Sequence, residues 1–105
     1  MKILITGAAG QIGSGLSKLL IENGHDLTLV DNLRNGYLEN LKDDANEVIA
    51  PFYEVDITSG EFFLKCGDQY DVIIHLAAIT SLPVCESYPL ETLRINVSGT
   101  ANVLE

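Results

Sequence analysis

The chain has 105 residues, of which 47% are hydrophobic, and fifteen acidic residues against six basic ones give a net charge of −9. This length allows one domain or part of one, and the hydrophobic content is sufficient for a packed core, which excludes a disordered chain. The negative charge argues against nucleic-acid binding because it would repel phosphates, and no apolar run approaches the ~20 residues that span a bilayer.

The first part of the chain predicts a strand, a helix and a second strand. Residues 2–6 are apolar on both faces, as is typical of a strand buried within a parallel sheet. A helix is expected over residues 11–23, and Gly24 suits a left-handed C-terminal cap. The helix is predicted from four apolar residues at helical spacing, Ile12, Leu16, Leu19 and Leu20. A second strand is predicted over residues 26–31.

The middle of the chain predicts two more strands and two short helices. After a polar loop, a weak helix is expected over residues 37–41 and a third strand over residues 47–55. Pro51 favours an edge position for the third strand because proline cannot donate to a β-ladder. A short helix over residues 59–66 and a fourth, strongly apolar strand over residues 71–76 follow.

The last predicted element is a helix that begins near Pro89. Its apolar stripe consists of Leu90, Leu93, Val97 and Leu104. The helical pattern stops at Glu105 without a capping residue, and the fourth strand has no fifth strand to cover it. We therefore expect residues 1–105 to form the N-terminal part of a larger domain.

The alternation of strands and helices predicts an α/β fold with a doubly wound parallel sheet of the Rossmann type. With the third strand at an edge, the expected strand order is 3-2-1-4. The sheet would then be incomplete, with only its first four strands in this chain.

Three glycines follow the first strand at the spacing of a dinucleotide-binding loop, TGAAGQIG at residues 6–13. Gly7 would make the tight turn, Gly10 would let the backbone approach a ligand closely, and Gly13 would allow contact between helix and strand. The first amides of the helix would then face a pyrophosphate. The alternative is that the glycines only shape a tight turn.

Asp31, which has no evident partner in the sequence, ends the second strand. Its carboxylate would accept hydrogen bonds from the hydroxyls of an adenosine ribose and would repel a 2′-phosphate, so NAD is favoured over NADP. Arg34 could instead pair with a 2′-phosphate, but a loop arginine is more often a solvated charge.

Asp56 and Ile57 follow the third strand and would suit the adenine ring, the carboxylate accepting from the amino group while the isoleucine packs on the ring. The alternative is that Asp56 caps the next turn together with Thr58.

Small residues after the fourth strand leave room for the ribose and nicotinamide of a dinucleotide. Ala77 and Ala78 lie where the strand order reverses, and Thr80 could add a hydroxyl. His75 is interpreted mainly as a hydrogen-bonded core residue rather than an acid or base. Asn96 interrupts an apolar helix face and could brace a strand or reach the cofactor.

No residues in the sequence are spaced as metal ligands, and no catalytic group is evident. Cys66 and Cys85 lack the spacing of a metal site. The chain opens directly with an apolar strand rather than a leader segment. Reduced thiols and a cytoplasmic location are therefore expected.

The sequence resembles the extended branch of the short-chain dehydrogenase/reductase superfamily, which contains NAD-dependent nucleotide-sugar epimerases and dehydratases. The similarity spans the whole chain through five segments, TGAAGQIG at 6–13, DNLRNG at 31–36, VDI at 55–57, HLAA at 75–78 and NVSGTANVLE at 96–105. The DNLRNG loop is most similar to that of UDP-glucose 4-epimerases.

The resemblance implies NAD as the cofactor and a nucleotide sugar as the substrate of the parent protein. It also implies a homodimer formed through the helix that begins near Leu90. The residues expected to hold the cofactor are Gly7, Gly10, Gln11, Ile12, Gly13, Asp31, Asn32, Leu33, Asn35, Gly36, Asp56, Ile57, Leu76, Ala77, Ala78, Thr80 and Asn96. Of these, Gln11 and Ile12 would contact the pyrophosphate through their backbone.

The chain departs from the family pattern in its catalytic residues. The family's reaction, a transient transfer of hydride from the sugar to NAD, uses a tyrosine four residues ahead of a lysine. The four tyrosines of this chain, none of which has such a lysine, are Tyr37, Tyr53, Tyr70 and Tyr88. We therefore expect residues 1–105 alone to bind NAD without catalysing a reaction. The alternative function is a noncatalytic NAD-binding or interaction module.

Overall fold

A parallel four-stranded sheet organises the part of the chain that the structure describes. The computed structural model describes residues 1–34, 36–58, 67 and 70–77 and the single residues 87, 90, 96 and 103. Its elements are β1 (Lys2–Thr6), α1 (Gln11–Glu22), β2 (Asp26–Asp31), the 3-10 helix η1 (Leu38–Leu41), β3 (Phe52–Glu54) and β4 (Val72–His75). The strand order is β3-β2-β1-β4, which confirms both the predicted order and the edge position of the third strand.

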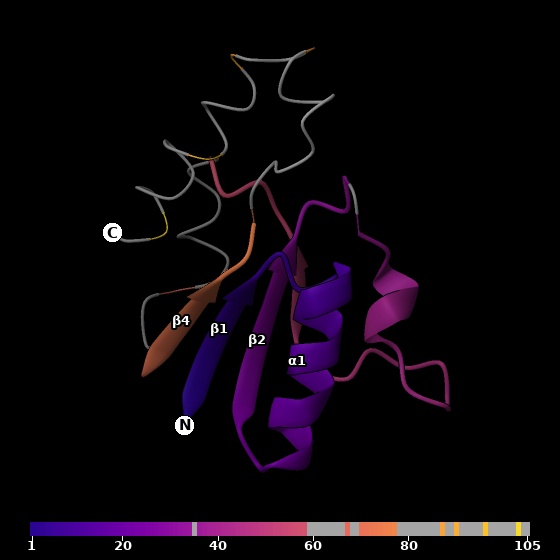
Figure 1. Cartoon of the computed structure of the whole chain (residues 1–105). Helices are drawn as coiled ribbons and strands as arrows, with labels where there is room; N and C mark the ends of the chain where they lie inside the picture. The colour runs from indigo at the N-terminus through magenta and orange to yellow at the C-terminus, as the bar shows by residue number, and fades with distance from the viewer. Residues whose placement is uncertain are drawn as a thin grey trace.

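The central strand β1 pairs in parallel with β2 on one side and β4 on the other. Thr6 at its carboxyl end is in register with Val30 of β2 and His75 of β4. The strands point the same way, so the loops that follow them gather at one edge of the sheet (Figure 1). This end of the sheet, where the strands finish, holds the glycine loop (residues 7–13), the segment after Asp31 and the residues after β4.

Helix α1 packs on one face of the sheet, and its buried residues are small. These residues are Gly13, Ser14 and Ser17. Ser17 donates a hydrogen bond of 2.7 Å to the carbonyl of Gly13, so its polar group is satisfied inside the helix. Gly24 follows with φ +83°, which confirms its predicted left-handed conformation.

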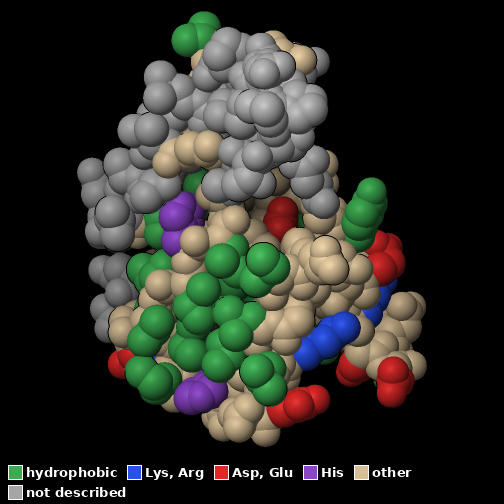
Figure 2. Space-filling view, in the orientation of Figure 1, with side chains coloured by type: hydrophobic (Ala, Val, Ile, Leu, Met, Phe, Trp, Pro, Cys, Tyr) green, Lys and Arg blue, Asp and Glu red, His purple; other side chains and the backbone are tan. Residues whose placement is uncertain are grey.

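The predicted apolar stripe of α1 is only partly right. Ile12 and Leu19 are 74% and 55% exposed, whereas Leu16 and Leu20 are half-buried. Gly13, Ser14 and Ser17 are the buried residues of the helix, while Leu20 and Ile21 pack against the hydrophobic cluster on this face of the sheet. Figure 2 shows hydrophobic side chains gathered over β1, β4 and the adjoining side of α1.

The third strand is shorter than predicted and begins at Phe52 rather than at residue 47. A tight turn occupies the preceding segment, where the Asp43 carboxylate accepts the amides of Ala45 and Glu47 at 2.9 and 3.1 Å. The weak helix predicted over residues 37–41 is the 3-10 helix η1.

The two faces of the sheet carry separate hydrophobic clusters. One cluster, on the α1 face, includes Ile3, Ile5 and Leu29, and the other includes Leu4, Val30 and Val103. The helix predicted over residues 59–66 and most of the last helix lie outside the described residues, including Leu93, Val97 and Leu104 of its stripe. Leu90 is described and is 81% exposed. None of the helices in the described ranges has the length and apolar character that crossing a membrane requires.

Candidate functional site

The glycine loop turns sharply between β1 and α1 and lies against the end of β4. Gly7 has φ +68°, a conformation that side chains rarely adopt. A Cβ added there would lie 2.7 Å from the carbonyl carbon of Leu76 and 2.8 Å from the amide nitrogen of Ala77. The position therefore requires glycine for two independent reasons.

Gly13 also lies in a space that no side chain fits. A Cβ there would overlap the carbonyl oxygen of Gly7 and approach the Cα of Ala8 to 2.9 Å. The predicted contact between helix and strand is thus a contact between the helix and its own preceding loop. At Gly10, in contrast, the nearest atom to an added Cβ is the carbonyl oxygen of Gly7 at 3.5 Å, an ordinary van der Waals contact, so a side chain there would meet no clash within the protein.

The N-terminus of α1 presents backbone amides without competition from side chains. Gly10 is the N-cap, no side chain caps the helix, and no acidic residue occupies its first turn. The Ser14 amide makes the first helical hydrogen bond, 2.9 Å to the carbonyl of Gly10. The amides of Gln11 and Ile12 have no acceptor within the helix, which is the arrangement that binds phosphate groups.

Asp31 joins the end of β2 to the glycine loop. One carboxylate oxygen accepts the amide of Ala9 at 2.9 Å, and the other accepts the amide of Leu33 at 2.8 Å. The expectation of an unpartnered aspartate is therefore wrong, because the fold brings the glycine loop to its side chain. Each oxygen of a carboxylate accepts more than one hydrogen bond, so these contacts orient Asp31 and leave acceptor capacity for hydroxyl groups.

The loop after Asp31 is held by its own polar side chains. The Asn32 side chain accepts the amide of Arg34 at 3.0 Å, and both residues are exposed. Leu33 adopts φ +60°, and the hydrogen bond from its amide to Asp31 supports this unusual conformation. Asn35 lies outside the described residues.

No pattern in the sequence indicates the contacts that surround Ala9. Its carbonyl oxygen accepts the amide of Tyr37 at 3.2 Å and the side-chain amide of Asn40 at 2.9 Å. Gly36 is buried against it, since a Cβ at Gly36 would lie 2.7 Å from the carbonyl carbon of Ala9. Asn40 was missed because a polar residue in a short helical turn normally indicates a solvated surface.

Thr6 and His75 connect the carboxyl ends of β1 and β4. The Thr6 hydroxyl oxygen accepts the amides of Leu76 and Ala77 at 3.1 and 3.3 Å and lies 2.6 Å from Nδ1 of His75. The hydrogen bond between this hydroxyl and Nδ1 ties the imidazole to the end of β1. His75 thus has the hydrogen-bonded structural role that the sequence favours.

Burial lowers the pKa of the His75 imidazole below its usual value of 6.5. The folded state therefore stays neutral at a pH where the unfolded chain binds a proton, and the stability that the neutral imidazole contributes is lost as the pH falls below 6.5. We expect the melting temperature of the wild type to drop between pH 7.5 and pH 5.5 by more than that of His75→Asn. An equal drop in both proteins, followed by circular dichroism, would rule out this role.

Asp56 makes the turn-capping contacts that were the alternative to adenine binding. Its carboxylate accepts the amide of Thr58 at 2.8 Å and the Thr58 hydroxyl at 2.7 Å. Ile57 is 5% exposed and belongs to the cluster on the face opposite α1. Adenine binding by this pair remains a prediction.

The residues after β4 are described only in part. Leu76 is exposed and Ala77 half-buried beside the glycine loop, whereas Ala78 and Thr80 lie outside the described residues. Asn96 is described and half-buried, and both interpretations of it remain predictions.

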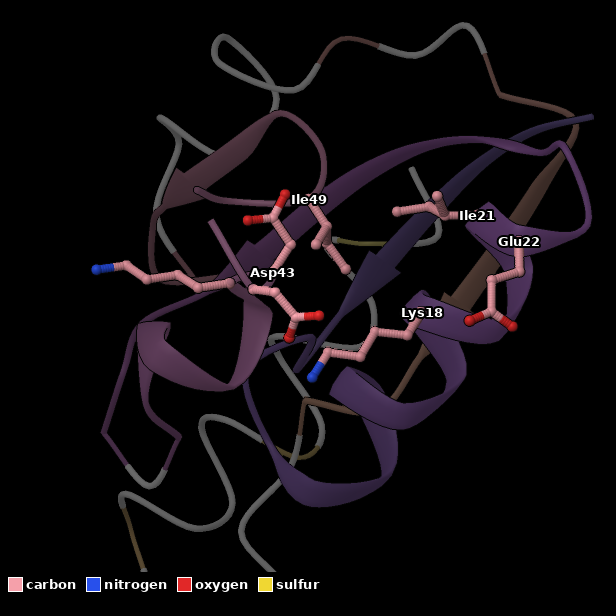
Figure 3. Close-up of a pocket in the computed structure, with 7 residues that line it drawn as sticks. Lys18, Ile21, Glu22, Asp43 and Ile49 are labelled. Carbon is pink, nitrogen blue, oxygen red and sulfur yellow. The ribbon is translucent and has the colours of Figure 1, made fainter. Parts of the chain in front are cut away.

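A hollow of about 280 Å³ lies at the other end of α1, away from the glycine loop (Figure 3). It is lined by Lys18, Ile21, Glu22, Lys42, Asp43, Asp44 and Ile49. None of these residues is a predicted cofactor contact. In Figure 3 the side chains reach into it from α1 and from the segment after η1.

The fold and the site define a dinucleotide-binding protein of the Rossmann class. Three features meet where the strands end. They are the glycine cradle, which is the glycine loop between Gly7 and Gly13 with no room for side chains at either glycine, the uncapped N-terminus of α1, and the acidic residue at the end of β2. The chain belongs to the NAD dependent epimerase/dehydratase family, whose pattern it matches over residues 3–105. This confirms the family and NAD as the cofactor.

Characterised relatives and solved structures span nearly all of this chain. A UDP-N-acetyl-alpha-D-glucosaminuronate decarboxylase from Bacillus cytotoxicus is 33% identical over 104 residues, which are 99% of this chain and 32% of the relative. The structure of a UDP-glucose 4-epimerase from Thermotoga maritima with UDP-glucose is 37% identical, with a TM-score of 0.85, and the match covers 99% of this chain and 33% of that one. A Thermus thermophilus UDP-glucose 4-epimerase in complex with NAD has a TM-score of 0.84 and 30% identity, covering 99% and 31%. The chain thus spans about a third of the length of the relatives that it matches.

Proposed function

We propose that this chain is the N-terminal, NAD-binding part of a longer nucleotide-sugar epimerase or dehydratase. The observation that carries the proposal is the glycine cradle, closed to side chains at Gly7 and Gly13 and hydrogen-bonded through Ala9 to Asp31. This arrangement fits a bound diphosphate beside a ribose, in a chain of a family that depends on NAD.

Three groups of residues would divide the cofactor between them. The glycine loop and the amides of Gln11 and Ile12 would hold the diphosphate, because Gly10 has no side chain and no side chain caps the helix. Asp31 would accept the hydroxyls of the adenosine ribose, and its negative charge would repel a 2′-phosphate. In the same proposal, the ribose is bordered by Asn32, Leu33, Asn35 and Gly36. The adenine is bordered by Asp56 and Ile57. The nicotinamide side is bordered by Leu76, Ala77, Ala78, Thr80 and Asn96.

The bound NAD would supply a hydride acceptor for the sugar carbon that is transiently oxidised. The residues of this chain would bind and orient the cofactor. The tyrosine that takes the proton and the lysine that lowers the pKa of that tyrosine would come from chain beyond residue 105, as would the sugar-binding lobe. This division is supported by the relatives, which are about three times as long as this chain.

A UDP-linked sugar is the proposed substrate class because the relatives and neighbours include a UDP-N-acetyl-alpha-D-glucosaminuronate decarboxylase and UDP-glucose 4-epimerases. A cytoplasmic homodimer is part of the same proposal.

The complete gene product provides the test. We expect it to convert at least one of UDP-glucose, UDP-N-acetylglucosamine and UDP-glucuronate when NAD is present, with the sugar product identified by NMR. Absorbance near 340 nm should rise transiently on mixing. Binding of NAD with no conversion of any UDP-sugar would contradict the enzyme function and favour the noncatalytic module.

A further inference from the structure

The peptide that joins Ala9 to Gly10 is held from outside the glycine loop. Its carbonyl oxygen accepts two hydrogen bonds, one from the Tyr37 amide at 3.2 Å and one from the Asn40 side chain at 2.9 Å. The amide on the other side of Ala9 is bound to the carboxylate of Asp31 at 2.9 Å. Ala9 itself is completely buried.

Asn40 reaches this peptide because η1 lies beside α1 after the loop turns back (Figure 1). The loop comes this close because Gly36 has no side chain, a Cβ there being 2.7 Å from the carbonyl carbon of Ala9. Asn40 is the one described side chain that donates to the carbonyl of Ala9. Its amide nitrogen is a donor, whereas the side chain of an aspartate in the same place would present only acceptors.

We propose that Asn40 is a positioning residue for NAD, acting through the Ala9–Gly10 peptide on both the diphosphate cradle and Asp31. Fixing that peptide sets the direction of the Gly10 backbone, the N-cap of α1. It also sets the position of the Ala9 amide, to which the Asp31 carboxylate is bound. The inference rests on the proposed NAD-binding function.

A merely space-filling role for Asn40 makes a different prediction from a positioning role. Aspartate has nearly the shape of asparagine, so packing alone would make Asn40→Asp milder than Asn40→Ala. Under our proposal the order is reversed. A carboxylate would face the carbonyl oxygen of Ala9 and push the peptide away, whereas alanine removes one donor and leaves the Tyr37 amide in place.

The experiment measures the dissociation constant for NAD by titration calorimetry with the complete gene product, well below its melting temperature. We expect Asn40→Ala to raise the constant about 5-fold and Asn40→Asp about 50-fold, both relative to the wild type. Asn46→Asp is the matched control, because it adds the same charge at an exposed turn and should change the constant less than twofold.

The outcomes separate this inference from the function on which it rests. A constant for Asn40→Ala within twofold of the wild type, or a milder effect of aspartate than of alanine, overturns the role of Asn40 while NAD binding stands. If Asn46→Asp raises the dissociation constant as much as Asn40→Asp does, the effect comes from the added charge, and the role of Asn40 is again overturned. If Asn40→Asp does not fold, Asn40→Leu replaces it, because leucine fills a similar space without a hydrogen-bond donor; a constant for Asn40→Leu within twofold of the wild type overturns the role of Asn40. Absence of NAD binding by the wild type contradicts the proposed function instead.

Discussion

Replacing Gly13 with alanine is expected to weaken NAD binding severely, while the same replacement at Gly15, two residues further along α1, leaves it intact. A Cβ at Gly13 would overlap the carbonyl oxygen of Gly7 and lie 2.9 Å from the Cα of Ala8. Both are backbone atoms of the cradle, so relief requires moving the loop itself. We expect a loss of about 3 kcal/mol in the free energy of unfolding and at least about a 100-fold loss of NAD affinity.

Gly15 provides the matched control within the same helix. No atom lies within 4 Å of a Cβ added there, and the residue is exposed. Alanine at this site should stabilise the protein by about 1 kcal/mol, because glycine is the weaker helix former. Urea unfolding and calorimetry on both variants test the pair. Equal NAD affinity in Gly13→Ala and the wild type would show that the cradle does not hold the cofactor.

Replacing Asp31 with asparagine is expected to lower NAD affinity about 30-fold, because a hydrogen bond to a charged group contributes roughly 1.5–3 kcal/mol. The two oxygens of Asp31 accept the amides of Ala9 and Leu33, and an asparagine presents one oxygen and one donor nitrogen. One backbone amide would lose its acceptor, and the ribose would lose a charged partner. Affinity for NADP should fall far less, since the repulsion of its 2′-phosphate is removed as well.

Asp26→Asn controls for the change in net charge. Asp26 begins β2, at the end of the strand away from the glycine loop, and is exposed. Its replacement should leave the dissociation constants of both cofactors within twofold. The deciding measurement is the ratio of the dissociation constants for NAD and NADP in each variant. A ratio for Asp31→Asn equal to that of the wild type would rule out the proposed discrimination by Asp31.

The strands at the centre of the sheet were predictable because their sequence leaves few alternatives. Residues 2–6 and 26–31 are short apolar runs bounded by turn residues, and they form strands over those same residues. The predicted third strand is too long, because the turn formed by the carboxylate of Asp43 cannot be recognised from hydrophobicity. Periodicity predicted the helix α1, but the pattern did not tell which of its residues would face the sheet.

The glycine loop is the part of the candidate site that the sequence predicts, because a tight turn of this kind favours glycine. Gly7 is predicted to make the tight turn after β1, and the structure has a turn there with φ +68°. The bond between Asp31 and Ala9 joins residues 22 positions apart, and that between Asn40 and Ala9 joins residues 31 positions apart. Such contacts depend on how the loop after β2 folds back on the glycine loop, which local sequence patterns do not encode.

The dissociation constant of the complete gene product for NAD tests the central claim most directly. If the cradle between Gly7 and Gly13 and the carboxylate of Asp31 form a dinucleotide site, calorimetry will give one NAD per chain with a constant in the micromolar range or below. NADP will bind more weakly. A folded protein that gives no binding heat with oxidised or reduced nicotinamide cofactor at several temperatures would contradict the account.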